Sequence, residues 1–374
     1  MQPSQHDTHL AHAIYRERVH CCSVPVHPTA TSRPEGSCGL EPVSTAVTET
    51  PIRSDEPRID ALNRRTTSDL VFRGVVRASA AVTLGLMILI GLFLTIRAWD
   101  ALRVAGWSFF TTAAWQPETG RFGIAAVLFG TVIIAVIALV LAVPVSICTA
   151  LFVTEYAPAR IRRPLTSFVD VLAAVPSIIY GIWGLYFLQH RVVPLSKWLS
   201  THLGFIPFFH TKDAQTASYS GSSFMAGLIV ALMIVPICTA VMREVFSQAP
   251  PGEKEGALAL GGTKWSVIKT VVLPFGKGGI IGGSMLGLGR ALGETIAVTL
   301  IISPTFDLRA LTHVLQQGAN SVAALVALRF SESNNFGISA LMAAGLTLFG
   351  ITLIVNAIAG VVVARSRSGR ATEI

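Results

Sequence analysis

The chain has 374 residues, of which 52% are hydrophobic and only 13% are charged, and its formal net charge is +8. Soluble domains carry about 25% charged residues, so this chain has too few charges to solvate the surface of a globule of its size. The composition therefore argues against a soluble enzyme, a disordered regulator and a nucleic-acid-binding protein, and it indicates a protein that crosses a membrane several times.

The first 70 residues differ in kind from the rest. They hold nine acidic and seven basic residues, many Pro, Ser and Thr, and no hydrophobic period. Such a segment cannot bury enough apolar surface to offset the entropy lost on ordering. Residues 1–70 are therefore predicted to be a disordered cytoplasmic tail ahead of a transmembrane domain at residues 71–374. The histidines and cysteines of the tail match no coordination spacing, so no metal or cofactor is expected.

A membrane-spanning helix needs about 20 predominantly apolar residues, and six segments meet this requirement. They predict an all-α polytopic membrane protein with six transmembrane helices, surrounded by membrane lipid. The predicted spans are residues 78–96, 131–154, 171–189, 224–242, 278–302 and 336–364. Pro144 is expected to kink the second span, and Pro176 to interrupt the third.

Lysine and arginine are unevenly distributed between the two sets of loops that these spans create. The first set is residues 155–164, 243–277 and 365–374, and the second set is residues 97–121, 189–223 and 303–335. The first set holds 11 basic residues in 55 positions, whereas the second holds eight in 93. Because cytoplasmic loops are enriched in Lys and Arg, the first set and both termini are predicted to be cytoplasmic.

The loop between the fourth and fifth spans has the most specific pattern. A short helical stretch at residues 255–260 ends at a glycine pair, as the C-termini of helices prefer. A second stretch places Trp265, Ile268 and Val272 on one face at helical spacing, and Pro274 closes the loop. These features predict two short helices at a steep angle to each other.

This loop resembles the EAA loop of ABC importer permeases, in which Glu-Ala-Ala is followed at fixed distances by Gly and by Ile-x-Leu-Pro. Gly256 stands in place of the first Ala and Val271 in place of Ile. The residues that fall on the spacing are Glu255, Ala257, Gly261, Leu273 and Pro274. In such permeases the loop binds the ATPase subunit, so the resemblance implies that residues 250–277 couple this chain to a separate ATPase.

The fifth span is rich in glycine, with seven glycines among residues 278–293. Gly279, Gly283 and Gly287 follow one another at intervals of four residues, which creates a smooth helix face. Such a face lets another helix approach closely, so packing against a neighbouring span is the expected role of most of these glycines.

Two further segments narrow the family. The fifth span contains Gly-Arg290-Ala-Leu-Gly-Glu294-Thr295-Ile-Ala, and the third contains Val-Pro-Ser177-Ile-Ile-Tyr180-Gly. Together with the loop, they look like the PstC-type subunit of bacterial phosphate importers. The resemblance implies a permease of type I ABC importer fold in the bacterial cell membrane. It also implies a PstA-type partner subunit, two ATP-binding subunits and an extracytoplasmic phosphate-binding protein. The chain is not expected to be an enzyme, since its one Gly-Lys pair lacks the rest of a P-loop.

Arg290 and Glu294 are four residues apart, so an unbroken helix would place them on one face. A charge at this depth costs about 2.5–3.5 kcal/mol, and two interpretations stay open. In one, the two charges form a structural ion pair. In the other, Arg290 supplies positive potential to a divalent oxyanion while Glu294 holds its rotamer. Thr295, Ser177 and Tyr180 complete the predicted translocation path.

Other functions remain as alternatives. The chain could be the PstA-type partner or a permease for another oxyanion. An ion-coupled secondary carrier could use Arg290 and Glu294 alone, but inverted repeats would then be expected, and spans one to three contain no matching charged, glycine-rich helix. A membrane-embedded hydrolase is disfavoured because no Gly-x-Ser-x-Gly or His-Glu-x-x-His occurs.

Overall fold

The computed structural model describes residues 67–206, 208–211, 217–306 and 313–366. The predicted tail, residues 1–70, lies almost wholly outside the described residues, as does most of the C-terminal segment 365–374. The description that follows concerns the predicted transmembrane domain.

The described part of the chain is almost entirely helical, which confirms the predicted fold class. Within the described residues, five helical segments are long and apolar enough to cross a membrane, and a bent pair of helices makes a sixth candidate if the two are counted as one span. The five are α1 (Thr67–Ala105), α3 with its π-helical end η3 (Ala125–Leu151 and Phe152–Tyr156), α7 (Ser223–Ser247), the run α9–η5–α10 (Lys264–Val267, Ile268–Val272 and Leu273–Leu292) and α14 (Asn335–Ser366).

The third predicted span, residues 171–189, is wrong in its boundaries. α4 (Ala159–Ala174) ends before Pro176, and a second helical run begins at Ser177 at an angle of 88° to α4. This run is made of α5 (Ser177–Trp183), η4 (Gly184–Leu188) and α6 (Gln189–His202). Pro176 causes the break because it lacks an amide proton and keeps the preceding residue out of the helical region; Val175 is extended, with ψ of 128°.

The fifth predicted span, residues 278–302, also differs in the structure. The helix that contains it already begins at Lys264, so the second short helix of the loop is continuous with the span. Pro274 does not close the loop, because it lies in the first turn of α10 directly after the π-helical turn η5. At the other end, α10 stops at Leu292, and a separate short helix, α11 (Ile296–Ile301), follows.

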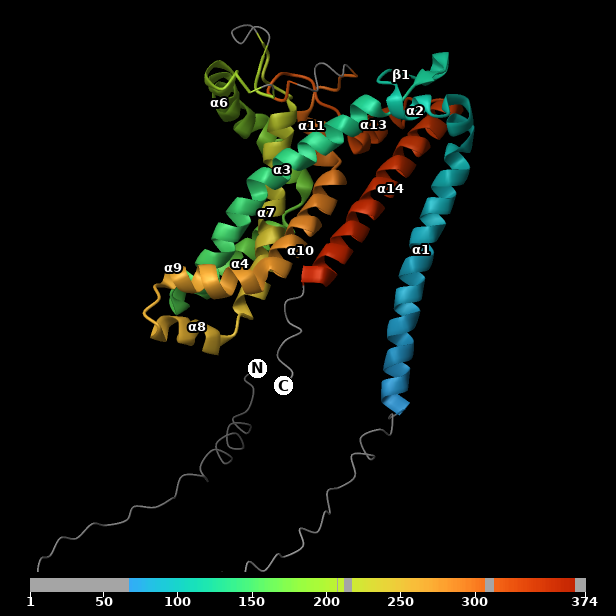
Figure 1. The fold of residues 1–374 in the computed structure, drawn as a ribbon. Helices are drawn as coiled ribbons and strands as arrows, with labels where there is room; N and C mark the ends of the chain where they lie inside the picture. The colour runs from blue at the N-terminus through green and yellow to red at the C-terminus, as the bar shows by residue number, and fades with distance from the viewer. Residues whose placement is uncertain (1–66, 207, 212–216, 307–312, 367–374) are drawn as a thin grey trace, which may run out of the picture. The chain divides into compact units, whose positions relative to one another are not determined.

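The remaining elements lie at the two ends of the spans (Figure 1). α8 (Pro251–Ala259) and α9 lie at one end, here called the loop end. The opposite end carries α2 (Ser108–Thr111), a two-stranded antiparallel sheet of β1 (Trp115–Gln116) and β2 (Arg121–Phe122) joined by η2 (Pro117–Thr119), and α13 (Val322–Arg329). The described residues of the two sets of loops that differ in basic content thus lie at opposite ends.

The core is formed by α3, α7 and α10. The glycine face of α10 packs on α7, as the four-residue spacing predicts. A Cβ atom at Gly279 would lie 2.6 Å from the side chain of Val245, and one at Gly287 would lie 2.6 Å from Sγ of Cys238. Between α3 and α7, the hydroxyl of Ser146 donates a hydrogen bond of 3.1 Å to the carbonyl oxygen of Val235. This core holds the functional elements below in place.

α1 contributes little to that core. Along most of its length its large apolar side chains are exposed, and only its final part carries buried residues, such as Ala98 and Ala101. An apolar helix exposed on all sides is compatible with a surface covered by lipid or by another membrane subunit.

Candidate functional site

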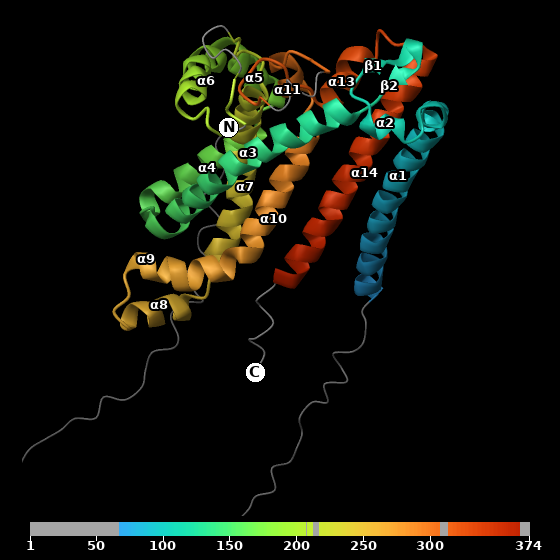
Figure 2. The same cartoon turned by 45° about the horizontal axis from the view of Figure 1, so that its top comes forward.

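The two helix breaks lie together in the structure, because α5 packs directly on α11 (Figure 2). A Cβ atom at Gly181 of α5 would lie 2.9 Å from Cα of Ala297 in α11, and one at Gly184 would collide with Ile229 of α7. Only glycine allows backbones to approach this closely. The third and fifth spans thus bring the predicted path residues into one region.

Arg290 lies in the last turn of α10 with its side chain exposed. Its guanidinium takes part in none of the ion pairs or hydrogen bonds found within the described ranges of the chain. The C-terminal end of a helix carries partial negative charge and partly compensates a cation at this position. The side chain is therefore free to bind an anion.

Glu294 does not pair with Arg290, contrary to the geometry expected of a continuous helix. Since α10 ends at Leu292, the two residues do not share a helical face. The Glu294 side chain is buried, 8% exposed, and its Oε1 accepts a hydrogen bond of 3.2 Å from the amide of Ala297. Glu294 therefore caps the first turn of α11, where an acidic group is favoured.

The other three predicted path residues differ in what their hydroxyls do. The Thr295 hydroxyl donates to the carbonyl oxygen of Gly293 at 3.2 Å, within the break itself. The Tyr180 hydroxyl donates to the carbonyl oxygen of Leu172 at 3.0 Å and so links α5 back to α4. Ser177, the first residue of α5, is half-buried, and its hydroxyl has no partner among the residues that the structure describes.

The loop with the EAA-like pattern forms a tight helical turn. Glu255 and Ala257 lie in α8, and Gly261 reverses the chain with φ of +81°, a conformation that side chains with Cβ rarely adopt. The Thr263 hydroxyl then accepts a hydrogen bond from the amide of Ser266 and caps α9. Leu273 is half-buried at the start of α10.

Trp265, Ile268 and Val272, which the sequence spacing places on one face, differ in burial. Ile268 and Val272 are buried, whereas Trp265 is 60% exposed. The helix changes from α9 to the π-helical η5 between them, which alters the angular spacing of side chains. Leu258 and Leu260 at the loop end are exposed as well, Leu260 to 91%.

Polar residues that the sequence patterns did not single out meet behind this loop. Nζ of Lys254 in α8 lies 2.7 Å from Oε1 of Glu155 in η3, and Nη2 of Arg243 lies 3.5 Å from Oδ1 of Asp170. These side chains, apart from that of Asp170, line a cavity of about 240 Å³ together with Arg162. No sequence pattern could have found the Lys254 pair, since its partners are 99 residues apart.

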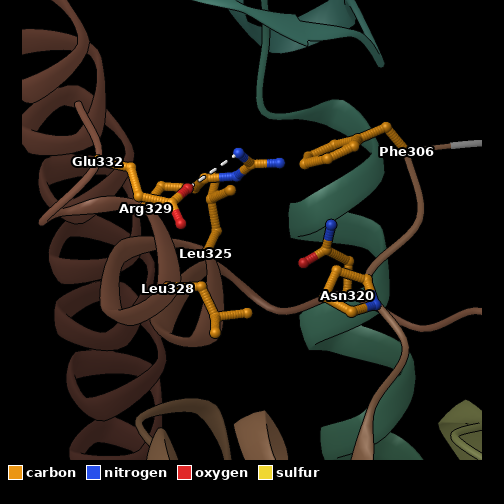
Figure 3. A pocket seen from close by; sticks show the side chains of 7 residues that line it. Phe306, Asn320, Leu325, Leu328, Arg329 and Glu332 are labelled. Atoms are coloured by element: carbon orange, nitrogen blue, oxygen red, sulfur yellow. Dashed lines mark hydrogen bonds and ion pairs between the residues drawn. The ribbon is translucent and has the colours of Figure 1, made fainter. Parts of the chain in front are cut away.

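Two cavities share a wall at the opposite end. The first, of about 290 Å³, has Arg329 and Glu332 on one side and Phe306 and Asn320 on the other (Figure 3). Nη1 of Arg329 and Oε2 of Glu332 are 3.2 Å apart. The second cavity, of about 410 Å³, is also lined by Arg329 and Glu332. Its other side is formed by residues 115–119, which make up β1 and η2. This end therefore offers recessed, charged surface outside the spans.

Comparison with known proteins identifies the family. The model of the "Binding-protein-dependent transport system inner membrane component" family matches residues 142–368. The chain is 40% identical over 293 residues to phosphate transport system permease protein PstC 2 of Mycobacterium bovis, covering 77% of this chain and 90% of the relative. It is 40% identical over 302 residues to the phosphate transport system permease protein PstC of Pasteurella multocida, covering 79% and 92% respectively.

Among solved structures, the chain matches a bacterial ABC transporter involved in the import of the acidic polysaccharide alginate, with a TM-score of 0.48, 17% identity, and coverage of 81% of this chain and 99% of that chain. The MetNI methionine ABC transporter in an inward-facing conformation matches with a TM-score of 0.44 and 15% identity, covering 65% of this chain and 94% of that chain. On the family match and the curated relatives, this chain belongs to the family of binding-protein-dependent transport system inner membrane components, and it is a multi-pass permease of a bacterial inner membrane.

Proposed function

We propose that this chain is one of two permease halves of an ATP-driven importer of inorganic phosphate. The relatives that are 40% identical along nine-tenths of their length are phosphate transport permeases. Within the chain, the observation that supports the proposal best is Arg290, an exposed cation near a break in a membrane span with no carboxylate partner in the described structure.

Arg290 can bind phosphate because its planar guanidinium presents donors in a fork that matches two phosphate oxygens. The cap that Glu294 forms on α11 matters here, since a carboxylate engaged with the amide of Ala297 does not compete with the anion for Arg290. The hydroxyl of Ser177 adds a neutral donor on the neighbouring half-helix. In this mechanism Glu294 is a structural residue of the path, not the holder of the arginine rotamer.

The loop end would bind the ATPase. Leu258, Leu260 and Trp265 are exposed on or beside α8, in the segment that carries the EAA-like spacing. Burying a leucine side chain completely contributes about 1.5–3 kcal/mol, so this surface can dock firmly in a groove of another subunit. The chain would hold no nucleotide site of its own, and the complete importer would contain two ATP-binding subunits.

Two further partners complete the proposed importer. A PstA-type subunit would cover the side of this chain on which Arg290 is exposed and close the path. A phosphate-binding protein would dock at the end opposite α8, where the two cavities share Arg329 and Glu332. The excess of basic residues in the loop-end segments supports placing that end and both termini in the cytoplasm.

Reconstitution of the complex tests this proposal. The chain should be purified with its partner and ATPase subunits, placed in proteoliposomes, and assayed for phosphate uptake with ATP and phosphate-loaded binding protein. We expect uptake that requires ATP and that excess sulfate does not suppress. Uptake without ATP would indicate an ion-coupled carrier, and suppression by sulfate would indicate a permease for another oxyanion.

A further inference from the structure

We propose that the ion pair between Lys254 and Glu155 is the link through which motion of α8 reaches the membrane helix α3. The inference rests on the proposed function, in which α8 binds the ATPase, and it deepens that function by naming a positioning pair. The importer would need this pair in order to convert ATPase closure into movement of the spans.

The ion pair between Lys254 and Glu155 connects α8 to the span formed by α3 and η3 through side chains. Among the ion pairs and side-chain hydrogen bonds within the described ranges, none other joins α8 to a membrane-crossing helix. α8 has no buried residue of its own. The Lys254 and Glu155 side chains are 22% and 17% exposed, which is far less than for the exposed pair Arg329–Glu332 at 51% and 67%. A shielded pair holds its geometry better than a fully solvated one.

Side-chain hydrogen bonds hold the backbone on both sides of Glu155. Glu155 lies in the π-helical turn η3, which redirects side chains relative to a regular helix and is often found at functional sites. Nη2 of Arg162 donates to the carbonyl oxygens of Thr154 at 3.0 Å and Ala157 at 3.4 Å. The Thr154 hydroxyl in turn donates a hydrogen bond of 3.0 Å to the carbonyl oxygen of Ala150. Glu155 is thus presented to Lys254 by a turn that is braced on both sides.

The other connections of α8 run through the backbone at its two ends. On one side α8 follows Pro250, and on the other it continues through Gly261, whose φ is +81°, into α9. α3 packs along α7 in the core, so a force applied at Glu155 moves both helices together. The turn at Gly261 leads through α9 directly into α10, whereas the ion pair is the side-chain link from α8 to α3.

Charge reversal separates this role from simple structural support. The complete importer should be reconstituted with Lys254→Gln, with Glu155→Gln, or with both residues exchanged, Glu155→Lys and Lys254→Glu. ATP hydrolysis stimulated by phosphate-loaded binding protein and phosphate uptake are measured on the same proteoliposomes. We expect each single variant to hydrolyse ATP but to carry about tenfold less phosphate per ATP, equivalent to ~1.4 kcal/mol of lost coupling. The exchanged pair should recover most of the wild-type ratio.

Arg163→Gln is the matched control, because Arg163 is an exposed cation of α4, outside residues 250–277, without an ion pair in the described structure. It should keep the wild-type ratio. An unchanged ratio in both single variants would overturn the proposal, as would failure of the exchanged pair to recover. If the ATPase subunit were lost when the single variants are purified, the pair would serve to assemble the complex, and the coupling proposal would also be overturned. If the wild-type importer carried no phosphate, the proposed function itself would be contradicted, and not only the role of the ion pair.

Discussion

Arg290 allows the sharpest test of the translocation path. Arg290→Gln keeps hydrogen-bonding capacity but removes the charge. A unit charge about 4 Å from an anion contributes between ~1 kcal/mol in water and ~4 kcal/mol at the effective dielectric constant near a protein surface. Because each ~1.4 kcal/mol corresponds to tenfold in an equilibrium constant, and phosphate carries more than one charge, uptake should fall at least about tenfold. Assembly should be normal, since Arg290 forms no ion pair with Glu294 in the structure.

Glu294→Gln provides the companion variant. The glutamine oxygen can still accept the hydrogen bond from the amide of Ala297 that Glu294 accepts at 3.2 Å. Losing the charge of such a bond costs about 1 kcal/mol, so the single variant should assemble and transport. The double variant should assemble yet fail to carry phosphate.

The assay is uptake of radiolabelled phosphate into proteoliposomes at matched amounts of protein, with membrane abundance measured in parallel. Arg163→Gln serves as the control, because it removes an exposed cation from α4, outside both the break and the ATPase-coupling segment. Uptake near the wild-type rate in the double variant would refute the pathway role of Arg290. Poor abundance of Arg290→Gln that Glu294→Gln rescues would show instead that the two charges neutralise each other.

Three further predictions concern topology, coupling and packing. In a cysteine-free background, a cysteine at Ser331 should react with an impermeant maleimide in intact cells and one at Thr263 should not; the reverse pattern would invert the proposed orientation. Gly261→Asp should insert normally but abolish transport driven by ATP, because a β-carbon is strained by about 1 kcal/mol or more at φ of +81° and the carboxylate projects toward the ATPase; wild-type stimulation of ATP hydrolysis by loaded binding protein would exclude this loop as the coupling element. Gly181→Ala should lower the free energy of unfolding by about 1–3 kcal/mol, since its methyl group would lie 2.9 Å from Cα of Ala297; thermal denaturation of the purified complex measures this, and an unchanged melting temperature would contradict the close contact of α5 with α11.

Much of this molecule is determined by local sequence. Runs of about 20 apolar residues are enough to predict a crossing, because a helix satisfies its own backbone hydrogen bonds in lipid. The glycine spacing at Gly279, Gly283 and Gly287 predicted the close packing that α10 makes with α7. The resemblance of the pattern from Glu255 to Pro274 to the EAA loop could likewise be read from the sequence, since it depends on residues within one short segment.

The tertiary structure decided where the helices break and which charges meet. Gly293 looks like the packing glycines before it, so the end of α10 at Leu292 and the capping role of Glu294 could not be predicted from spacing. Pro176 predicted an interruption, but neither the bend of 88° nor the close packing of α5 on α11 could be read from that residue. The pair Lys254–Glu155 joins residues 99 positions apart. Such contacts depend on how separate helices pack, and that packing is a property of the whole fold, whereas hydropathy and spacing describe one segment at a time.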